Sequence, residues 1–217
     1  MHNICIALLI CTVYNKNRKF FGKYEQMFAF SEKVCYNRII LIKGLMKLFC
    51  CFTGHRPQQL PWKTNENDPS CIKLKQIISD LIDDAADSGI SGFYCGMALG
   101  FDTYCAEEVI KKKNGGMPLK LYAAIPCTEQ CNDWSSKDRA RYDAILKRCD
   151  GCTLISPHYT STCMLARNRY MVDNSSMIIS AWNGSFRGGT GYTLRYGKHM
   201  NRDIRIIHLP DLNVTVI

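Results

Sequence analysis

The chain has 217 residues and a formal charge of +9, from 28 Lys and Arg against 19 Asp and Glu. This length suits one domain with a sizeable core, or one domain and an appendage. Residues 1–45 carry seven basic and two acidic residues, a balance of +5, which leaves only +4 for the other 172. Residues 46–217 are therefore only mildly basic. This charge fits an anionic small ligand as well as nucleic acid and does not distinguish between them.

The 13 cysteines show no regular framework, and the chain is longer and richer in apolar residues than a small secreted disulfide scaffold. We therefore expect reduced, mostly buried thiols in a cytoplasmic protein. Those expected inside strands are Cys50, Cys51, Cys95 and Cys152. A zinc site is a weaker alternative, since one set of spacings loosely resembles a zinc ribbon: Cys127, Cys131, Cys149 and Cys152. Without that set, no metal is expected.

The first 45 residues differ from the remainder. The apolar run at residues 4–11 is too short to span a bilayer, which takes about 20 residues, and no basic residue precedes it. No membrane segment is predicted. Residues 1–45 are interpreted as an N-terminal extension, and residues 46–217 as the domain, with Met46 as its start. The alternative is a real N-terminal strand and helix that pack on the core.

From residue 46 onward, strand and helix signals alternate. Short apolar runs predict strands at residues 48–53, 93–98, 119–125, 152–156, 177–182 and 204–208. Helical periodicity and stop signals predict helices at residues 71–88, 102–113, 137–149, 163–173 and 190–200. Continuous apolar strands separated by helices indicate a parallel sheet covered on both faces. The predicted fold is α/β, a Rossmann-like three-layer fold with a mostly parallel sheet of about six strands.

Ligands of such folds bind beyond the carboxyl ends of the strands, where two clusters lie in the first half. In the first, Gly54 allows a close turn, His55 can donate or titrate, and Arg56 can contact a phosphate in bidentate fashion. An ordinary surface turn is its plainer interpretation. In the second, Gly96 and Gly100 permit close backbone approach. Asp102 follows them and could bind a ribose hydroxyl, although we favour helix capping.

Two further clusters lie in the second half. On the helix at 163–173, Arg167 and Arg169 point in different directions, and one of them is expected to serve the site with Asn168. A solvated basic face is the alternative, more so for Arg169. The turn after residue 182 offers backbone N–H donors, a hydroxyl and a flat ring for a base, from Gly188, Gly189, Thr190 and Trp182.

These motifs together carry a resemblance. The runs Thr53-Gly-His-Arg-Pro57, Gly96-Met-Ala-Leu-Gly-Phe-Asp102, Arg167-Asn-Arg-Tyr-Met-Val-Asp173 and Gly188-Gly-Thr190 resemble, in order and spacing, the YpsA-like family of the SLOG superfamily. The resemblance covers residues 46 to about 208. It implies a Rossmann-like domain that binds a nucleotide or nucleotide-derived ligand, such as an ADP-ribose or NAD-like compound, without an established reaction. A homodimer is a further expectation from it.

Two relatives in the superfamily define the alternatives. LOG phosphoribohydrolases use a Gly-Gly-x-Gly-Thr-x-x-Glu loop for N-glycosidic cleavage, but Tyr192 and Arg195 stand here at the threonine and glutamate positions. A cation cannot act as a carboxylate base, so such hydrolysis would need another carboxylate. The DNA-processing protein DprA has an arginine in its glycine turn where Leu99 stands here, which weakens the case for binding single-stranded DNA.

The favoured function is therefore binding or sensing of a nucleotide-derived ligand. The alternatives are a LOG-type hydrolase, with Asp102 or His55 as acid or base, and a DprA-like DNA-binding accessory protein. No catalytic residue is assigned. The expected ligand-binding residues are Gly54, His55, Arg56, Gly96, Gly100, Asp102, Arg167, Asn168, Trp182, Gly188, Gly189 and Thr190.

Overall fold

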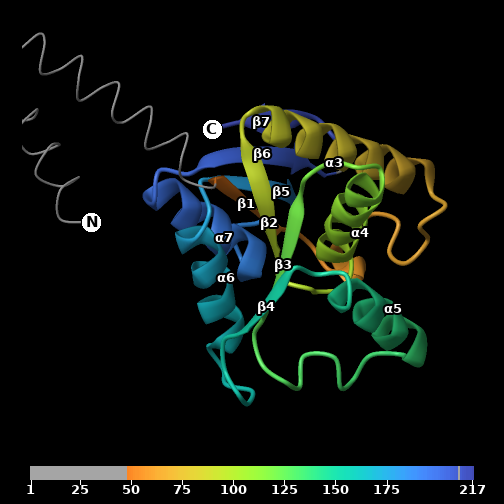
Figure 1. The fold of residues 1–217 in the computed structure, drawn as a ribbon, viewed down its shortest axis with the longest axis vertical. Helices are drawn as coiled ribbons and strands as arrows, with labels where there is room; N and C mark the ends of the chain where they lie inside the picture. Colours follow the sequence, from red (N-terminus) through yellow and green to blue (C-terminus); the bar gives the residue numbers. More distant parts are fainter. Residues whose placement is uncertain (1–47, 210) are drawn as a thin grey trace, which may run out of the picture. The chain divides into compact units, whose positions relative to one another are not determined.

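A computed structural model describes residues 48–209 and 211–217. The predictions for residues 1–45, and for a domain start at Met46, fall outside these residues. Seven strands form one sheet in the order β4-β3-β2-β1-β5-β6-β7 (Figure 1). In chain order they are β1 (Leu48–Thr53), β2 (Ile90–Cys95), β3 (Lys120–Ile125), β4 (Gly151–Leu154), β5 (Met177–Trp182), β6 (Asp203–His208) and β7 (Val214–Val216).

Six of these strands pair in parallel, as the alternating pattern predicts, and only β7 runs antiparallel, against β6. The chain builds outward from β1 through β2 and β3 to β4, and then returns to place β5 on the other side of β1. This reversal is a topological switch point, where loops from the two halves diverge and leave a crevice at the carboxyl edge of the sheet. The Rossmann-like α/β fold is confirmed.

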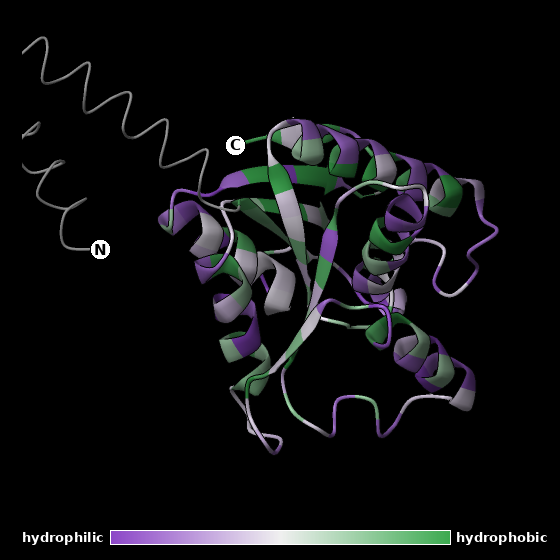
Figure 2. Cartoon of the chain, viewed as in Figure 1, coloured by the Kyte–Doolittle hydropathy of each residue, from purple (hydrophilic) through white to green (hydrophobic). Residues whose placement is uncertain are grey.

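Helices cover both faces of the sheet (Figure 1). One face carries α3 (Pro69–Asp87), α4 (Phe101–Asn114) and α5 (Ser136–Leu146), and the other carries α6 (Cys163–Asp173) and α7 (Gly188–His199). A single 3₁₀ turn, η3 (Pro57–Gln59), follows β1. Hydrophobic and hydrophilic residues alternate around α3, whose apolar stripe faces the core (Figure 2). Asp68 caps this helix by accepting a hydrogen bond from the N–H of Ser70 at 2.8 Å.

Successive residues of the central strands point to opposite faces of the sheet and pack into two separate hydrophobic cores. Cys50 and Phe52 pack under α3 and α4, whereas Cys51 between them packs under α6 and α7. Because both faces are covered, β5 buries all its residues except Trp182, and β1 buries its last four, as their apolar sequences predict. No helix within residues 48–209 and 211–217 has both the length and the apolar character needed to cross a bilayer.

The structure corrects several boundaries and one burial prediction. The second strand starts and ends three residues earlier than predicted, so Gly96 begins a loop, and the helix predicted to reach Cys149 ends at Leu146. The fourth strand ends at Leu154. Cys152 on that strand is exposed rather than buried, because β4 forms an edge of the sheet. The short strand β7 carries three exposed residues, and its Val-Thr-Val alternation is too short to predict a strand by itself.

Candidate functional site

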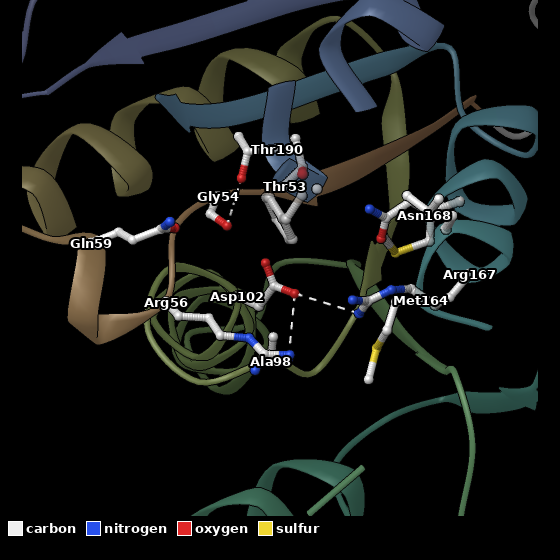
Figure 3. Close-up of a pocket in the computed structure, with 14 residues that line it drawn as sticks. Thr53, Gly54, Arg56, Gln59, Ala98, Asp102, Met164, Arg167, Asn168 and Thr190 are labelled. Carbon is white, nitrogen blue, oxygen red and sulfur yellow. Dashed lines mark hydrogen bonds and ion pairs between the residues drawn. The ribbon is translucent and has the colours of Figure 1, made fainter. Parts of the chain in front are cut away.

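A cavity of about 280 Å³ lies at the carboxyl edge of the sheet, where the chain turns back from one half to the other (Figure 3). Its volume is close to the lower end of the range for small-molecule sites, roughly 300–1,000 Å³. Its walls come from the loop after β1, the loop after β2 with α4, and helices α6 and α7. The lining residues are Phe52, Thr53, Gly54, Arg56, Gln59, Ala98, Asp102, Met164, Leu165, Arg167, Asn168, Met171, Gly189 and Thr190.

The loop after β1 forms one wall. Arg56 is exposed, and its side chain extends toward Asp102 and Ala98 in Figure 3. His55 is buried beside it, and both of its ring nitrogens are engaged within the protein. Nδ1 lies 2.8 Å from Oε1 of Gln59, while Nε2 accepts a hydrogen bond from the backbone N–H of Asn183 at 3.2 Å. His55 therefore joins the loop after β1 to the loop after β5 and does not line the cavity.

The second wall begins with the glycine turn after β2. Gly100 has a φ of +90°, and a Cβ there would lie 2.8 Å from the carbonyl oxygen of His55, so this position requires glycine. Gly100 is also the N-cap of α4, and no side chain caps that helix. The prediction that Asp102 caps the helix is therefore wrong. Asp102 lies within the first turn, and its Oδ2 instead accepts from the loop N–H of Ala98 at 3.3 Å.

Helix α6 contributes a buried guanidinium. Arg167 is only 7% exposed, and its Nη1 donates to the carbonyl oxygen of Gly96 and lies 3.8 Å from Oδ2 of Asp102. A Cβ at Gly96 would overlap that guanidinium, so the absence of a side chain there makes room for the arginine. Nε of Arg167 is buried and has no hydrogen-bond partner within the described residues. Arg169, by contrast, is exposed and bonds the hydroxyl of Tyr192.

Burial dominates the electrostatics of the pair at the base of the cavity. Loss of solvent raises the pKa of the Asp102 carboxyl, although Arg167, the Ala98 N–H and Arg56 all act in the opposite direction. Loss of solvent likewise lowers the pKa of the Arg167 guanidinium, and Asp102 opposes that shift. One carboxylate thus faces two guanidiniums, which leaves the described part of the cavity with an excess of positive charge.

The N-terminus of α7 closes the site. Its first residues, Gly188 to Thr190, carry backbone N–H groups that have no partner within a helix, and its N-cap residue Arg187 supplies no capping side chain. Gly189 and Thr190 line the cavity. The hydroxyl of Thr190 donates to the carbonyl oxygen of Gly54 at 3.0 Å, so it holds α7 against the loop after β1 (Figure 3). A helix N-terminus in this position favours an anion.

The structure brings seven of the twelve expected residues to the cavity wall: Gly54, Arg56, Asp102, Arg167, Asn168, Gly189 and Thr190. The other five, which are His55, Gly96, Gly100, Trp182 and Gly188, lie outside the lining. Three of these five shape the wall from behind, as described above for His55, Gly96 and Gly100. The indole of Trp182 donates to the carbonyl oxygen of Ser185 at 2.8 Å and packs edge-on against the ring of Phe186.

The expected set of ligand-binding residues missed the apolar part of the wall and two polar residues, Thr53 and Gln59. Met164, Leu165 and Met171 come from α6, and their helical spacing with Arg167 and Asn168 is the only signal that could have placed them together. Gln59 lies in η3, two residues beyond the Gly-His-Arg-Pro run, and no motif or period in the sequence distinguishes it from an ordinary polar surface residue.

The alternative zinc set finds no support in the part of the chain that the structure describes. Residues 48–209 and 211–217 contain no group of three or more His, Cys, Asp or Glu side chains placed to hold a metal ion. Cys127 is buried, Cys131 and Cys149 are half-buried, and Cys152 is exposed, all as free thiols.

The sheet order, the helices on both faces and the cavity at the switch point define a Rossmann-like α/β domain with a pocket suited to an anion. The family model YpsA, described as the YspA SLOG family, matches residues 50–212. The chain therefore belongs to this SLOG family, as the motifs predict. The match includes every residue that lines the cavity.

Similar proteins come from species of Halalkalibacterium and Bacillus, among others. A UPF0398 protein of Halalkalibacterium halodurans is 25% identical over 166 residues, which cover 74% of this chain and 87% of the relative. The UPF0398 protein YpsA of Bacillus subtilis is 23% identical over 170 residues, with coverages of 76% and 94%. The uncharacterized SPbeta prophage-derived protein YoqJ of Bacillus subtilis is 27% identical over 164 residues, with coverages of 67% and 93%.

Proposed function

We propose that this protein binds a nucleotide-derived ligand of the ADP-ribose, NAD or nucleoside phosphate type at the carboxyl edge of its sheet. The cationic groups and backbone donors of the pocket would hold the phosphate part. The apolar side chains of α6, Met164, Leu165 and Met171, would contact the nucleoside part. This arrangement suits binding or sensing, with the ligand released unchanged.

The observation that carries this proposal is the buried Arg167. A guanidinium that is 7% exposed loses most of its hydration, and desolvation is costly unless its donors are satisfied. Its Nε has no partner within the described residues, and its nearest carboxylate oxygen lies at 3.8 Å, beyond hydrogen-bond distance. Arg167 lines the cavity, so a phosphate bound there beside the N-terminus of α7 would accept from its guanidinium and offset its buried charge.

A second candidate is N-glycosidic hydrolysis of a nucleoside phosphate, and Asp102 is the reason to retain it. Arg195, at the position of the LOG glutamate, is exposed, does not line the cavity, and donates to the carbonyl oxygen of Phe186. Asp102 does line the cavity, and burial raises its pKa. A carboxyl group of raised pKa in a pocket is a candidate acid or base.

The test compares two arginines of the same helix by titration calorimetry of the full chain with AMP, ADP-ribose and NAD. Arg167→Ala removes the buried donor and should weaken binding at least tenfold, because hydrogen bonds to charged groups contribute roughly 1.5–3 kcal/mol each. Arg169→Ala is the matched control. It removes an exposed arginine two residues away and should leave the dissociation constant unchanged within about twofold.

Each outcome decides between the candidates. Ligand recovered intact after incubation supports binding without turnover, whereas release of the free base, abolished in Asp102→Asn, assigns hydrolysis. An equal loss of affinity in the Arg167 and Arg169 variants would show that the ligand does not bind in this pocket. Binding of single-stranded oligonucleotides alone, with a steep loss as salt rises, would replace the proposal by DNA binding.

A further inference from the structure

A chain of hydrogen bonds at the rim of the pocket determines which way Gln59 faces. The chain starts at the backbone N–H of Asn183, in the loop after β5, and passes through the ring of His55 to the amide of Gln59, in η3. His55 is 4% exposed, so both of its nitrogens must find partners inside the protein. Gln59 lines the cavity and lies beside Gly54 in Figure 3.

The direction of every bond in this chain follows from its first donor. A backbone N–H can only donate, so Nε2 of His55 must accept at 3.2 Å and carries no proton. The proton of the neutral ring is then on Nδ1, which donates to Gln59 at 2.8 Å. The atom of Gln59 that receives this bond must be its carbonyl oxygen, Oε1. The orientation of the amide is thereby decided without ambiguity between its oxygen and its nitrogen.

The amide nitrogen of Gln59 is left as a donor at the cavity. Within the residues that the structure describes, Nε2 of Gln59 forms no hydrogen bond, while its Oε1 is engaged by His55. Gln59 is exposed, so water solvates this donor in the free protein, and a ligand that covers it must supply an acceptor in place of that water. Phosphate and ribose oxygens are such acceptors, and the nearby Arg56 and α7 N-terminus attract the same part of a ligand.

We propose that Gln59 is a specificity-determining residue of this pocket, which donates from Nε2 to a phosphate or ribose oxygen of the ligand, and that His55 is the positioning residue that orients it. This inference rests on the proposed function and deepens it. His55 acts as a neutral ring with the proton on Nδ1, and it links the loops after β1 and β5 while it turns the amide. The selected ligand class is one that presents an oxygen acceptor to η3.

The experiment measures the tautomer of His55 and the affinity of Gln59 variants in the full chain. Long-range ¹H–¹⁵N correlation spectra near neutral pH should show His55 with a proton on Nδ1 and a bare Nε2. In calorimetric titrations with AMP and ADP-ribose, Gln59→Met should bind roughly three- to tenfold more weakly, the range expected for one hydrogen bond. Gln59→Glu should bind more weakly still, because a carboxylate cannot donate and repels the phosphate.

The matched control is Gln58→Glu, which introduces the same charge one residue away. Gln58 is exposed and does not line the cavity, so this variant should change the dissociation constant by no more than about twofold. Equal affinities for the wild type and both Gln59 variants overturn the donor role, and a proton on Nε2 of His55 overturns the positioning role. Failure of the wild type to bind either nucleotide overturns the proposed function itself, and the donor role with it.

Discussion

Asp102 is the residue whose protonation state should respond to the ligand. Its carboxyl interacts electrostatically with Arg167 from α6 and with Arg56 from the loop after β1. Its charge also helps to raise the pKa of three buried thiols, those of Cys51 on β1, Cys95 on β2 and Cys105 on its own helix. Burial raises its pKa, and an anion bound nearby would raise it further because like charges repel. Ligand binding and protonation of this carboxyl should therefore favour one another.

The first prediction follows from this linkage. The affinity for ADP-ribose, whose pyrophosphate stays ionised, should increase as the pH falls from neutral toward the raised pKa of Asp102. Binding should be accompanied by proton uptake, which calorimetry detects as a dependence of the binding enthalpy on the buffer. Asp102→Asn should abolish both effects. A wild-type affinity that stays constant or falls on acidification would contradict the prediction.

The same sign applies to the contribution of Asp102 to stability. Because its pKa is raised in the folded state, the folded chain binds more protons than the unfolded chain in the range between the ordinary and the raised value. The contribution of Asp102 to the free energy of unfolding therefore decreases as the pH rises through that range. At neutral pH the buried carboxylate of Asp102 therefore lowers the stability of the fold, a cost that is common at ligand sites.

At the scale of an element, helix α7 contains two glycines that differ in the space available for a side chain. A Cβ at Gly191 would lie 2.7 Å from the carbonyl oxygen of Ser185 and 2.8 Å from that of Phe186, both in the loop after β5. A Cβ at Gly189 would meet only the amide of Asn168, at an ordinary 3.6 Å. The first glycine therefore allows the loop to pack on the helix, whereas the second leaves open space at the cavity.

The second prediction compares alanine at these positions. Gly191→Ala should lower the free energy of unfolding by roughly 1–2 kcal/mol, because overpacking of about 1–3 kcal/mol exceeds the helix-propensity gain of up to about 1 kcal/mol. Gly189→Ala should leave the free energy of unfolding unchanged or slightly raised, because only the propensity gain applies. Urea unfolding of both variants measures this. Equal free energies of unfolding for the two variants would contradict this prediction, because they would show that the loop after β5 moves to accommodate the added methyl group at no energetic cost.

At the scale of the whole molecule, the pocket collects residues from both halves of the sheet. Arg56 and Asp102 come from the half that β1 to β4 builds, and Gly189 and Thr190 from the half that follows β5. A ligand held between them binds the folded state only, since unfolding separates the two halves. Its binding free energy should therefore add directly to the stability of the domain.

The third prediction concerns thermal unfolding of the full chain. A probe nucleotide at about 100 times its dissociation constant should add roughly 2.7 kcal/mol to the free energy of unfolding. In a domain of this size, that corresponds to an increase in the melting temperature of roughly 5–10 °C. Arg167→Ala should lose about half of this increase or more at the same concentration, because a tenfold weaker affinity leaves only about 1.4 kcal/mol, while Arg169→Ala retains it. A shift of equal size in both variants would indicate binding outside the pocket.

Much of this organisation was accessible from the sequence. Strand and helix periods depend on local patterns, so β1, β5 and α6 appear at the predicted residues, and glycines with polar neighbours at the strand ends indicated the binding edge. Register and side-chain direction depend on contacts between distant segments. Trp182 therefore turns toward Ser185, Asp102 toward Ala98, and His55 into a buried bridge, although their positions in the motifs were read correctly.

The sequence by itself determined the alternation of strands and helices and the family, because these follow from local periodicity and from short motifs in a definite order. Only the tertiary structure decided which polar groups share a cavity. Arg167 is buried against the carbonyl oxygen of Gly96, which lies far from it in the chain. His55 orients Gln59 only in the tautomer that a third, distant residue, Asn183, imposes on its ring. Such pairings depend on how the two halves of the sheet pack, which no local pattern encodes.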